Sequence, residues 1–212
     1  MAHNVVTLHL SYLLNTSLRC VWQNQASILY GALMEHSSQK NGAKYDGVAR
    51  LIHWLVVVLI AAQFVVGWTM PDVHKGTQPT GLIAWHLGVG AVLIAVMTIR
   101  IVWRITHRPP PETLAPMLSA VSKITHLLLY AVLIAVPLLG WANASSRGWV
   151  VRLLGALSYP NLTPVGSSLG HAMGDIHGVL AWVLFTLIVM HVAAALFHRF
   201  VLRDQVLQRM TP

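Results

Sequence analysis

Cysteine and charged residues are both scarce in this chain of 212 residues. Cys20 is the only cysteine, which excludes an internal disulfide, and the absence of a Cys-x-x-Cys-His motif excludes covalent c-type haem attachment. Charged residues make up 9% of the chain, whereas soluble proteins carry about a quarter. Hydrophobic residues make up 56% and form continuous rather than alternating runs, so we expect a helical integral membrane protein and not a barrel.

The apolar residues form four spans, each close to the roughly twenty residues that a helix needs to cross a bilayer. They cover about residues 51–70, 82–105, 124–142 and 176–202. Pro71 follows the first span, and three consecutive prolines at 109–111 follow the second. We therefore expect an all-α membrane protein, folded as a four-transmembrane-helix bundle.

Lysine and arginine predict the orientation of the spans. The net charge of +8 does not indicate nucleic acid, because the basic residues flank apolar spans as the positive-inside bias requires. The basic residues near the termini and around the middle loop, including those at the cytoplasmic ends of the spans, are Lys40, Lys44, Arg50, Arg100, Arg104, Arg108, Lys123, Arg199, Arg203 and Arg209. Loops 71–81 and 143–175 hold only Lys75, Arg147 and Arg152. We expect both termini in the cytoplasm and these two loops outside.

Residues 1–48 precede the first span and are treated separately. They lack a charged n-region followed by a long apolar region and a cleavage site, so we expect no cleaved signal peptide. Met34 begins a polar stretch that is typical of a short cytoplasmic tail. We expect an N-terminal extension at 1–48 and a four-helix domain at 49–212. One hypothesis is that translation starts at Met34; a loosely ordered or interfacial segment is the alternative.

His177 and His191 lie fourteen residues apart within the fourth span. An α-helix turns about 100° and rises about 1.5 Å per residue, so the two rings share a face and lie roughly 21 Å apart. The hydrocarbon core is about 30 Å thick, which puts one ring near each side of the membrane. His86 matches His177 in depth on the outer side, and His53 matches His191 on the cytoplasmic side.

Each matched pair takes one histidine from each of two helices. This arrangement suits bis-imidazole ligation of a flat macrocycle lodged between helices. Four unrelated, hydrogen-bonded histidines are the alternative. Zinc is a weaker alternative, because its four ligands must meet at one point and the offset between His177 and His191 keeps these rings apart.

The fourteen-residue offset recurs on the other three spans. Gly67 follows His53, Gly140 follows His126 and Arg100 follows His86 at this spacing. The glycines leave room either for a macrocycle or for close helix packing. Arg100 either pairs with a haem propionate or extends to the membrane interface.

His126 and His198 also lie near the cytoplasmic face, and His198 follows His191 by seven residues on the same helix face. Their rings could donate a hydrogen bond to a quinone carbonyl or relay protons, which makes them candidate catalytic residues. Interface histidines without a special role are the alternative.

Four short motifs surround these histidines: Arg50-Leu51-Ile52-His53-Trp54, Trp85-His86-Leu87-Gly88, Asp175-Ile176-His177-Gly178 and Met190-His191-Val192-Ala193-Ala194-Ala195-Leu196-Phe197-His198. In their order and spacing these motifs resemble those of the bacterial cytochrome b561 family. The resemblance covers about residue 45 to the end of the chain. It implies a four-helix bundle in the bacterial inner membrane with two haem b groups. His53 and His191 would ligate one haem, and His86 and His177 the other.

The resemblance also implies a reaction. The best-understood type of member is similar to a superoxide oxidase, in which superoxide gives an electron on the periplasmic side and ubiquinone is reduced in the membrane. We therefore expect an oxidoreductase of the superoxide:ubiquinone type. One alternative is an electron-transfer subunit that exchanges electrons between quinone and a partner dehydrogenase or periplasmic redox protein. A lesser alternative is a histidine-based metal transporter without haem.

Overall fold

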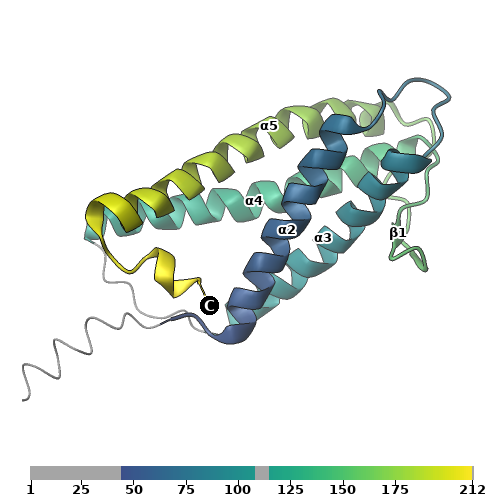
Figure 1. Ribbon diagram of the computed structural model, residues 1–212. Helices are drawn as coiled ribbons and strands as arrows, with labels where there is room; N and C mark the ends of the chain where they lie inside the picture. The colour runs from purple at the N-terminus through teal and green to yellow at the C-terminus, as the bar shows by residue number, and fades with distance from the viewer. Residues whose placement is uncertain (1–43, 108–114, 212) are drawn as a thin grey trace, which may run out of the picture. The chain divides into compact units, whose positions relative to one another are not determined.

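The computed structural model describes residues 44–107 and 115–211. In these residues four helices are long and apolar enough to cross a membrane (Figure 1). They are α2 (Gly47–Thr69), α3 (Gly81–Thr106), α4 (Pro116–Ser146) and α5 (Ser168–Phe197), which continues into a π-helical turn, η1 (His198–Leu202). The expected all-α, four-helix membrane fold is confirmed. The hypotheses on residues 1–33 and on a start at Met34 fall outside the described residues.

Local sequence explains where the helices begin. Asp46 caps α2, because its carboxylate accepts a hydrogen bond from the N–H of Ala49 at 2.7 Å. α4 begins at Pro116 rather than near residue 124, since proline suits the first turn of a helix. α5 begins at Ser168 rather than near residue 176, where the side chain of Ser167 caps it. The apolar spans thus underestimate the lengths of both helices, which contain 31 and 30 residues.

The helices form two hairpins, α2 with α3 and α4 with α5. Figure 1 shows α4 and α5 running side by side, with α2 and α3 crossing beside them. Apolar side chains from all four helices fill the middle of the bundle, namely Val56, Leu93, Met97, Leu129, Leu133, Val136 and Leu184. Aromatic rings also join α2 to α5, as in the pair Phe64 and Phe185 at 5.5 Å between centroids.

The two ends of the bundle differ in the segments that cover them: connecting loops at one end and the C-terminal segment at the other. We call one the loop end; it comprises residues 70–80 and 147–167, with the antiparallel pair β1 (Arg152–Leu153) and β2 (Leu157–Ser158). There Trp149 and Val151 are buried in a cluster with Ile83. We call the other the tail end; it comprises the start of α2 and residues 203–211, with the short helix η2 (Leu207–Arg209).

The C-terminal segment is hydrogen-bonded to the start of α2 at the tail end. After η1 the chain turns back at Arg203, whose φ of 53° is left-handed, and runs to the start of α2 (Figure 1). Arg50 Nη1 donates a hydrogen bond to the main-chain oxygen of Thr211 at 2.9 Å. Trp54 Nε1 donates to the main-chain oxygen of Met210, also at 2.9 Å. These bonds connect α2 to the segment that follows α5.

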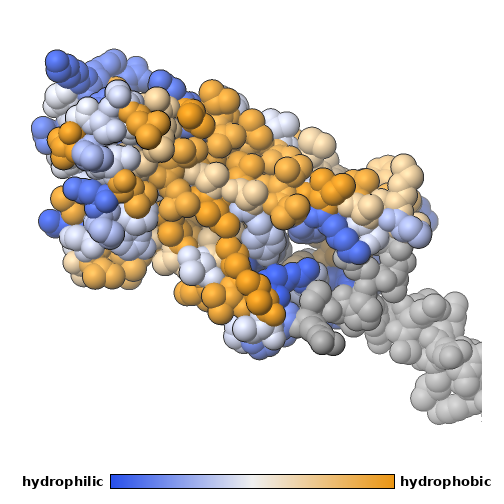
Figure 2. Space-filling model, turned by 180° about the vertical axis from the view of Figure 1, so that it is seen from behind, coloured by the Kyte–Doolittle hydropathy of each residue, from blue (hydrophilic) through white to orange (hydrophobic). Residues whose placement is uncertain are grey.

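The surface of the bundle is apolar where a bilayer would cover it. Orange, hydrophobic side chains occupy the middle of the face seen in Figure 2, and blue ones gather toward its ends. Several large apolar side chains are widely exposed, among them Leu51 (69%), Ile105 (79%) and Phe200 (69%). An exposed apolar face of this kind indicates contact with lipid rather than water.

The cap of α2 gives a pH-dependent prediction. The hydrogen bond from Ala49, and a second from Trp103 Nε1 at 3.2 Å, hold the pKa of Asp46 below its usual value. A depressed folded pKa means that the stabilisation is complete above the unfolded pKa of about 4 and is lost as pH falls through the folded pKa. We expect Asp46→Ala to destabilise the detergent-solubilised protein at pH 7 by about 1 kcal/mol, with a smaller loss below pH 4.

Thermal unfolding of wild type and variant at both pH values measures this effect. Asp46→Asn is the matched control, because an asparagine oxygen still caps the helix. A loss of the same size at pH 7 and at pH 3 would show that the charge of Asp46 plays no part.

Candidate functional site

His86 of α3 and His177 of α5 face each other at the loop end. Their ring centroids lie 6.0 Å apart, with an angle of 80° between the planes. A metal bound at about 2 Å from one nitrogen of each ring places the two centroids about 6 Å apart. The observed separation is the one that two imidazoles binding the same metal would require. We call this pair the loop-end site.

The hydrogen bond of His177 sets its tautomer. Nδ1 of His177 lies 2.8 Å from the main-chain oxygen of Val136 on α4. Because a carbonyl oxygen only accepts, Nδ1 carries the proton and Nε2 keeps a free lone pair. Histidines that bind metals show this arrangement, with the second ring nitrogen donating to an acceptor. His177 is thus prepared for ligation through Nε2.

Two glycines at the fourteen-residue offset make room for the rings of this site. A Cβ at Gly140 would lie 3.0 Å from Nδ1 and Cε1 of His177, and a Cβ at Gly67 would lie 3.4 Å from Cε1 of His86. Gly88 and Gly178, by contrast, have no described atom within 4 Å of an added Cβ. Gly67 and Gly140 therefore permit close approach of the imidazoles, whereas Gly88 and Gly178 border open space.

Three histidines gather near the tail end, which we call the tail-end site. His126 of α4 and His191 of α5 are in contact, with ring centroids 5.3 Å apart. His53 of α2 lies beside Arg100 of α3, which also contacts Tyr130, one turn after His126 on α4. Nδ1 of His126 lies 2.7 Å from the main-chain oxygen of Ser122, so its Nε2 is the free nitrogen. The expected partners His53 and His191 thus share their level with His126.

Arg100 of α3 points into the bundle at the same level. Its Nη2 lies 3.1 Å from Nδ1 of His53, and its Nε donates a hydrogen bond to the hydroxyl of Tyr130 on α4 at 3.0 Å. Nη1 is buried and has no hydrogen-bond partner among the described residues. The side chain of Arg100 is thus directed at His53 and Tyr130, and a buried Nη1 with an unused donor is suited to an anion.

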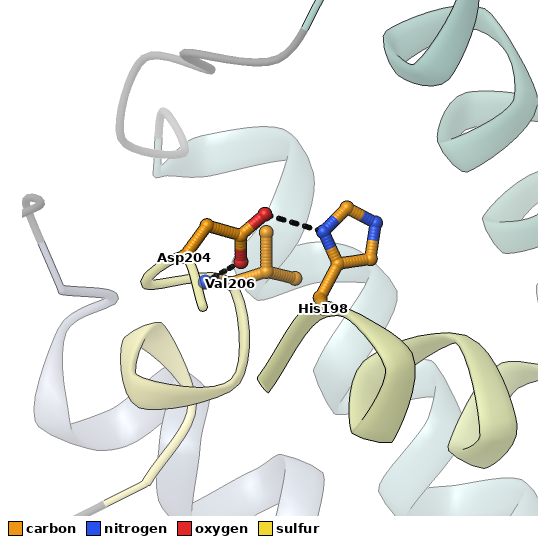
Figure 3. A network of polar contacts seen from close by, with 3 residues as sticks. All are labelled: His198, Asp204 and Val206. Carbon is orange, nitrogen blue, oxygen red and sulfur yellow. Dashed lines mark hydrogen bonds and ion pairs between the residues drawn. The ribbon is translucent and has the colours of Figure 1, made fainter. Parts of the chain in front are cut away.

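His198 is held by an aspartate that sequence analysis did not identify. Nδ1 of His198 lies 2.5 Å from Oδ2 of Asp204, and the other carboxylate oxygen accepts a hydrogen bond from the N–H of Val206 at 3.1 Å (Figure 3). The carboxylate orients the imidazole and leaves Nε2 available to a ligand. The available signal was an acidic residue six positions after His198, beyond the end of the apolar span.

A fixed positive charge lies at the loop end. Arg147 Nη1 donates to the main-chain oxygen of His74 and Nε donates to Oδ1 of Asn143, both at 3.4 Å. The guanidinium also lies 5.5 Å from the centroid of the Trp149 ring. Trp149, His86 and His177 line one cavity, so the charge stands beside the loop-end site.

Apolar helices that bring histidines of different helices face to face form a membrane helical bundle of the class that can hold a cofactor between its helices. Residues 44–212 match the family model described as prokaryotic cytochrome b561. The chain belongs to the prokaryotic cytochrome b561 family, as its motifs predicted. It is therefore a multi-pass protein of the bacterial inner membrane, and haem b is the cofactor that the family implies.

Similar proteins cover most of the chain. Cytochrome b561 homolog 2 of Escherichia coli K12 is 29% identical over 178 residues, which are 79% of this chain and 90% of the relative. Probable superoxide oxidase CybB of Yersinia pestis is 28% identical over 177 residues, 80% of this chain and 96% of the relative. Cytochrome b562 of Cereibacter sphaeroides is 26% identical over 171 residues, which are 78% of this chain and 94% of the relative. All three are similar along nearly their whole length.

Proposed function

We propose that this protein oxidises superoxide at the periplasmic face of the inner membrane and reduces ubiquinone within the membrane. The facing pair of His86 and His177, with a second histidine group at the opposite end, carries the proposal. The similarity to a relative named probable superoxide oxidase supports the choice of donor. Two superoxide anions become two dioxygen molecules, and their two electrons with two protons convert one ubiquinone into ubiquinol.

Two haem groups would be held by four histidines, His86 with His177 and His53 with His191. Bound haem b supplies reversible one-electron transfer. Since a ligating histidine needs a proton on Nδ1, Arg100 must release Nδ1 of His53 for this residue to bind iron through Nε2. The unused donors of Arg100 suit a haem propionate.

The loop end would face the periplasm, as the distribution of lysine and arginine predicts. Arg147 supplies a positive charge there, next to the Trp149 ring that lines the cavity of the loop-end site. A positive field raises the encounter rate of a small anion such as superoxide and weakens as salt is added. The chain thus offers the donor an attractive surface without a dedicated binding pocket.

The tail end would supply protons to the quinone. Nε2 of His198 is free because Asp204 accepts at Nδ1, and Nε2 of His126 is free because Ser122 accepts at Nδ1. A histidine paired with a carboxylate can donate a proton and take up another from the cytoplasm. We therefore assign proton delivery to His126 and His198, with Asp204 as the residue that orients His198.

Substitution of His198 tests this role. We expect His198→Ala to slow reoxidation of the reduced protein by ubiquinone roughly 100-fold, since a positioned proton donor is lost. Asp204→Asn should have a smaller effect, because the imidazole remains but is less well oriented. Stopped-flow spectroscopy of the haem α-band measures the rate.

Thr125→Val is the matched control, because Thr125 adjoins His126 and its hydroxyl donates to Val121 of its own helix. Each variant should retain two haem groups per chain, which separates a loss of proton delivery from a loss of folding. Reoxidation of His198→Ala at the wild-type rate would contradict the assignment.

A reduced-minus-oxidised spectrum is the first test of the proposed function. We expect a sharp α-band typical of haem b, and we expect superoxide to generate it from the oxidised protein. A protein with the α-band that superoxide fails to reduce would instead be an electron-transfer subunit for a partner dehydrogenase or periplasmic redox protein. The partner would then be identified by co-purification.

A further inference from the structure

Gln63 is a polar side chain in the apolar middle of α2. Its Nε2 donates a hydrogen bond to the main-chain oxygen of His86 on α3 at 2.8 Å. Gly90 permits this approach, because a Cβ at that position would lie 3.1 Å from Nε2. The contact fixes the orientation of the amide: the nitrogen faces the α3 backbone, and Oε1 is left for another donor.

Gln63 and His86 each have a buried side-chain atom that lacks a hydrogen-bond partner. Oε1 of Gln63 and Nδ1 of His86 are both buried without a hydrogen-bond partner in residues 44–107 and 115–211. Gln63 and His86 also line the same cavity. An unpaired buried amide oxygen costs free energy, which is recovered when a donor reaches it. Nδ1–H of His86 is such a donor once Nε2 binds a metal.

His177 has a hydrogen-bond acceptor at Nδ1, and His86 lacks one among the described residues. Val136 lies four residues before Gly140, and its main-chain oxygen accepts the hydrogen bond from His177. Gln63 lies four residues before Gly67, which is the corresponding position on α2. At that position the chain carries a side-chain amide whose oxygen is free. Gln63 is therefore placed to accept a hydrogen bond from Nδ1 of His86, as Val136 accepts one from Nδ1 of His177.

We propose that Gln63 is a positioning residue of the loop-end site, whose Oε1 accepts the hydrogen bond from Nδ1–H of His86. This inference rests on the proposed ligation of haem by His86 and adds the acceptor that ligation requires. An acceptor at Nδ1 makes the imidazole a stronger donor to iron and favours the ferric state. Gln63 thus lowers the reduction potential of the haem at this site.

Redox titration of the purified holoprotein tests the proposal. Gln63→Met keeps the length of the side chain and removes the acceptor. We expect it to raise the potential of one haem and not the other, by about a tenfold change in the ferric–ferrous equilibrium, or 59 mV for one electron. Gln63→Glu keeps an acceptor oxygen and should return that potential to the wild-type value or below it.

Thr98→Val is the control for substitution within the spans, because Thr98 is exposed and donates to Ile94 of its own helix. Potentials unchanged in Gln63→Met, or raised equally by Gln63→Glu, would overturn the role of Gln63 while leaving the two-haem assignment intact. A wild-type protein whose loop-end site holds no haem would instead refute the ligation on which the inference rests. Titration in the His53→Ala background shows which component belongs to the loop-end site.

Discussion

Purified His177→Ala protein is expected to contain one haem per chain instead of two. His177 is half of the facing pair at the loop end, and its Nδ1 is already bound to Val136, so its Nε2 is the ligating atom. Without that nitrogen the iron at this site keeps only His86, and the haem is not retained through purification. The ratio of extracted haem to protein measures the loss.

His171→Ala is the matched control for this experiment. His171 lies on the same helix, is exposed, and has Nδ1 2.8 Å from the main-chain oxygen of Ser167. We expect this variant to keep both haem groups. Full haem content in His177→Ala would refute the assignment of the loop-end site.

The second prediction concerns the tail-end site, where three histidines compete for two ligand positions. We expect His53→Ala to lose one haem and His126→Ala to keep two. The matched depth of His53 and His191 in the sequence and the family motifs both favour this pair. Loss of the tail-end haem should also abolish electron delivery to ubiquinone, because the loop-end site alone does not reach the tail end.

The contact between His126 and His191 gives the competing result. Their rings lie 5.3 Å apart, so a haem lost from His126→Ala and retained in His53→Ala would make His126 the ligand. His53 would then be the partner of Arg100, as their 3.1 Å contact already suggests. Haem content of the two variants, measured side by side, decides between these arrangements.

The lengths of the apolar runs predicted the fold, and helix periodicity predicted which histidines share a level. Four apolar runs of suitable length gave the four helices, since a bilayer permits few other structures. The fourteen-residue offset placed His177 and His191 on one face of a helix, and it placed Gly67 and Gly140 at the level where they now accommodate imidazole rings. These are consequences of helix geometry and need no knowledge of the neighbouring helices.

Contacts between side chains of different helices could not be predicted from the sequence. Helix periodicity does not fix how each helix is rotated against its neighbours. The contacts of Arg100 with Tyr130 and of Gln63 with His86 depend on that rotation. Asp204 was missed because it follows the apolar span and meets His198 only after the π-helical turn brings the chain back. The early start of α5 was missed because hydropathy identifies the apolar core of a helix rather than its capped end.

The most direct test of the central claim supplies superoxide to the protein in liposomes that contain ubiquinone. Superoxide is generated outside, and ubiquinol and haem reduction are followed together. We predict that the α-band appears first, that ubiquinol then forms with one molecule for every two superoxide anions consumed, and that His177→Ala abolishes both. Ubiquinol formation that persists in His177→Ala, or haem that superoxide never reduces, would contradict a path from the loop-end site to the quinone.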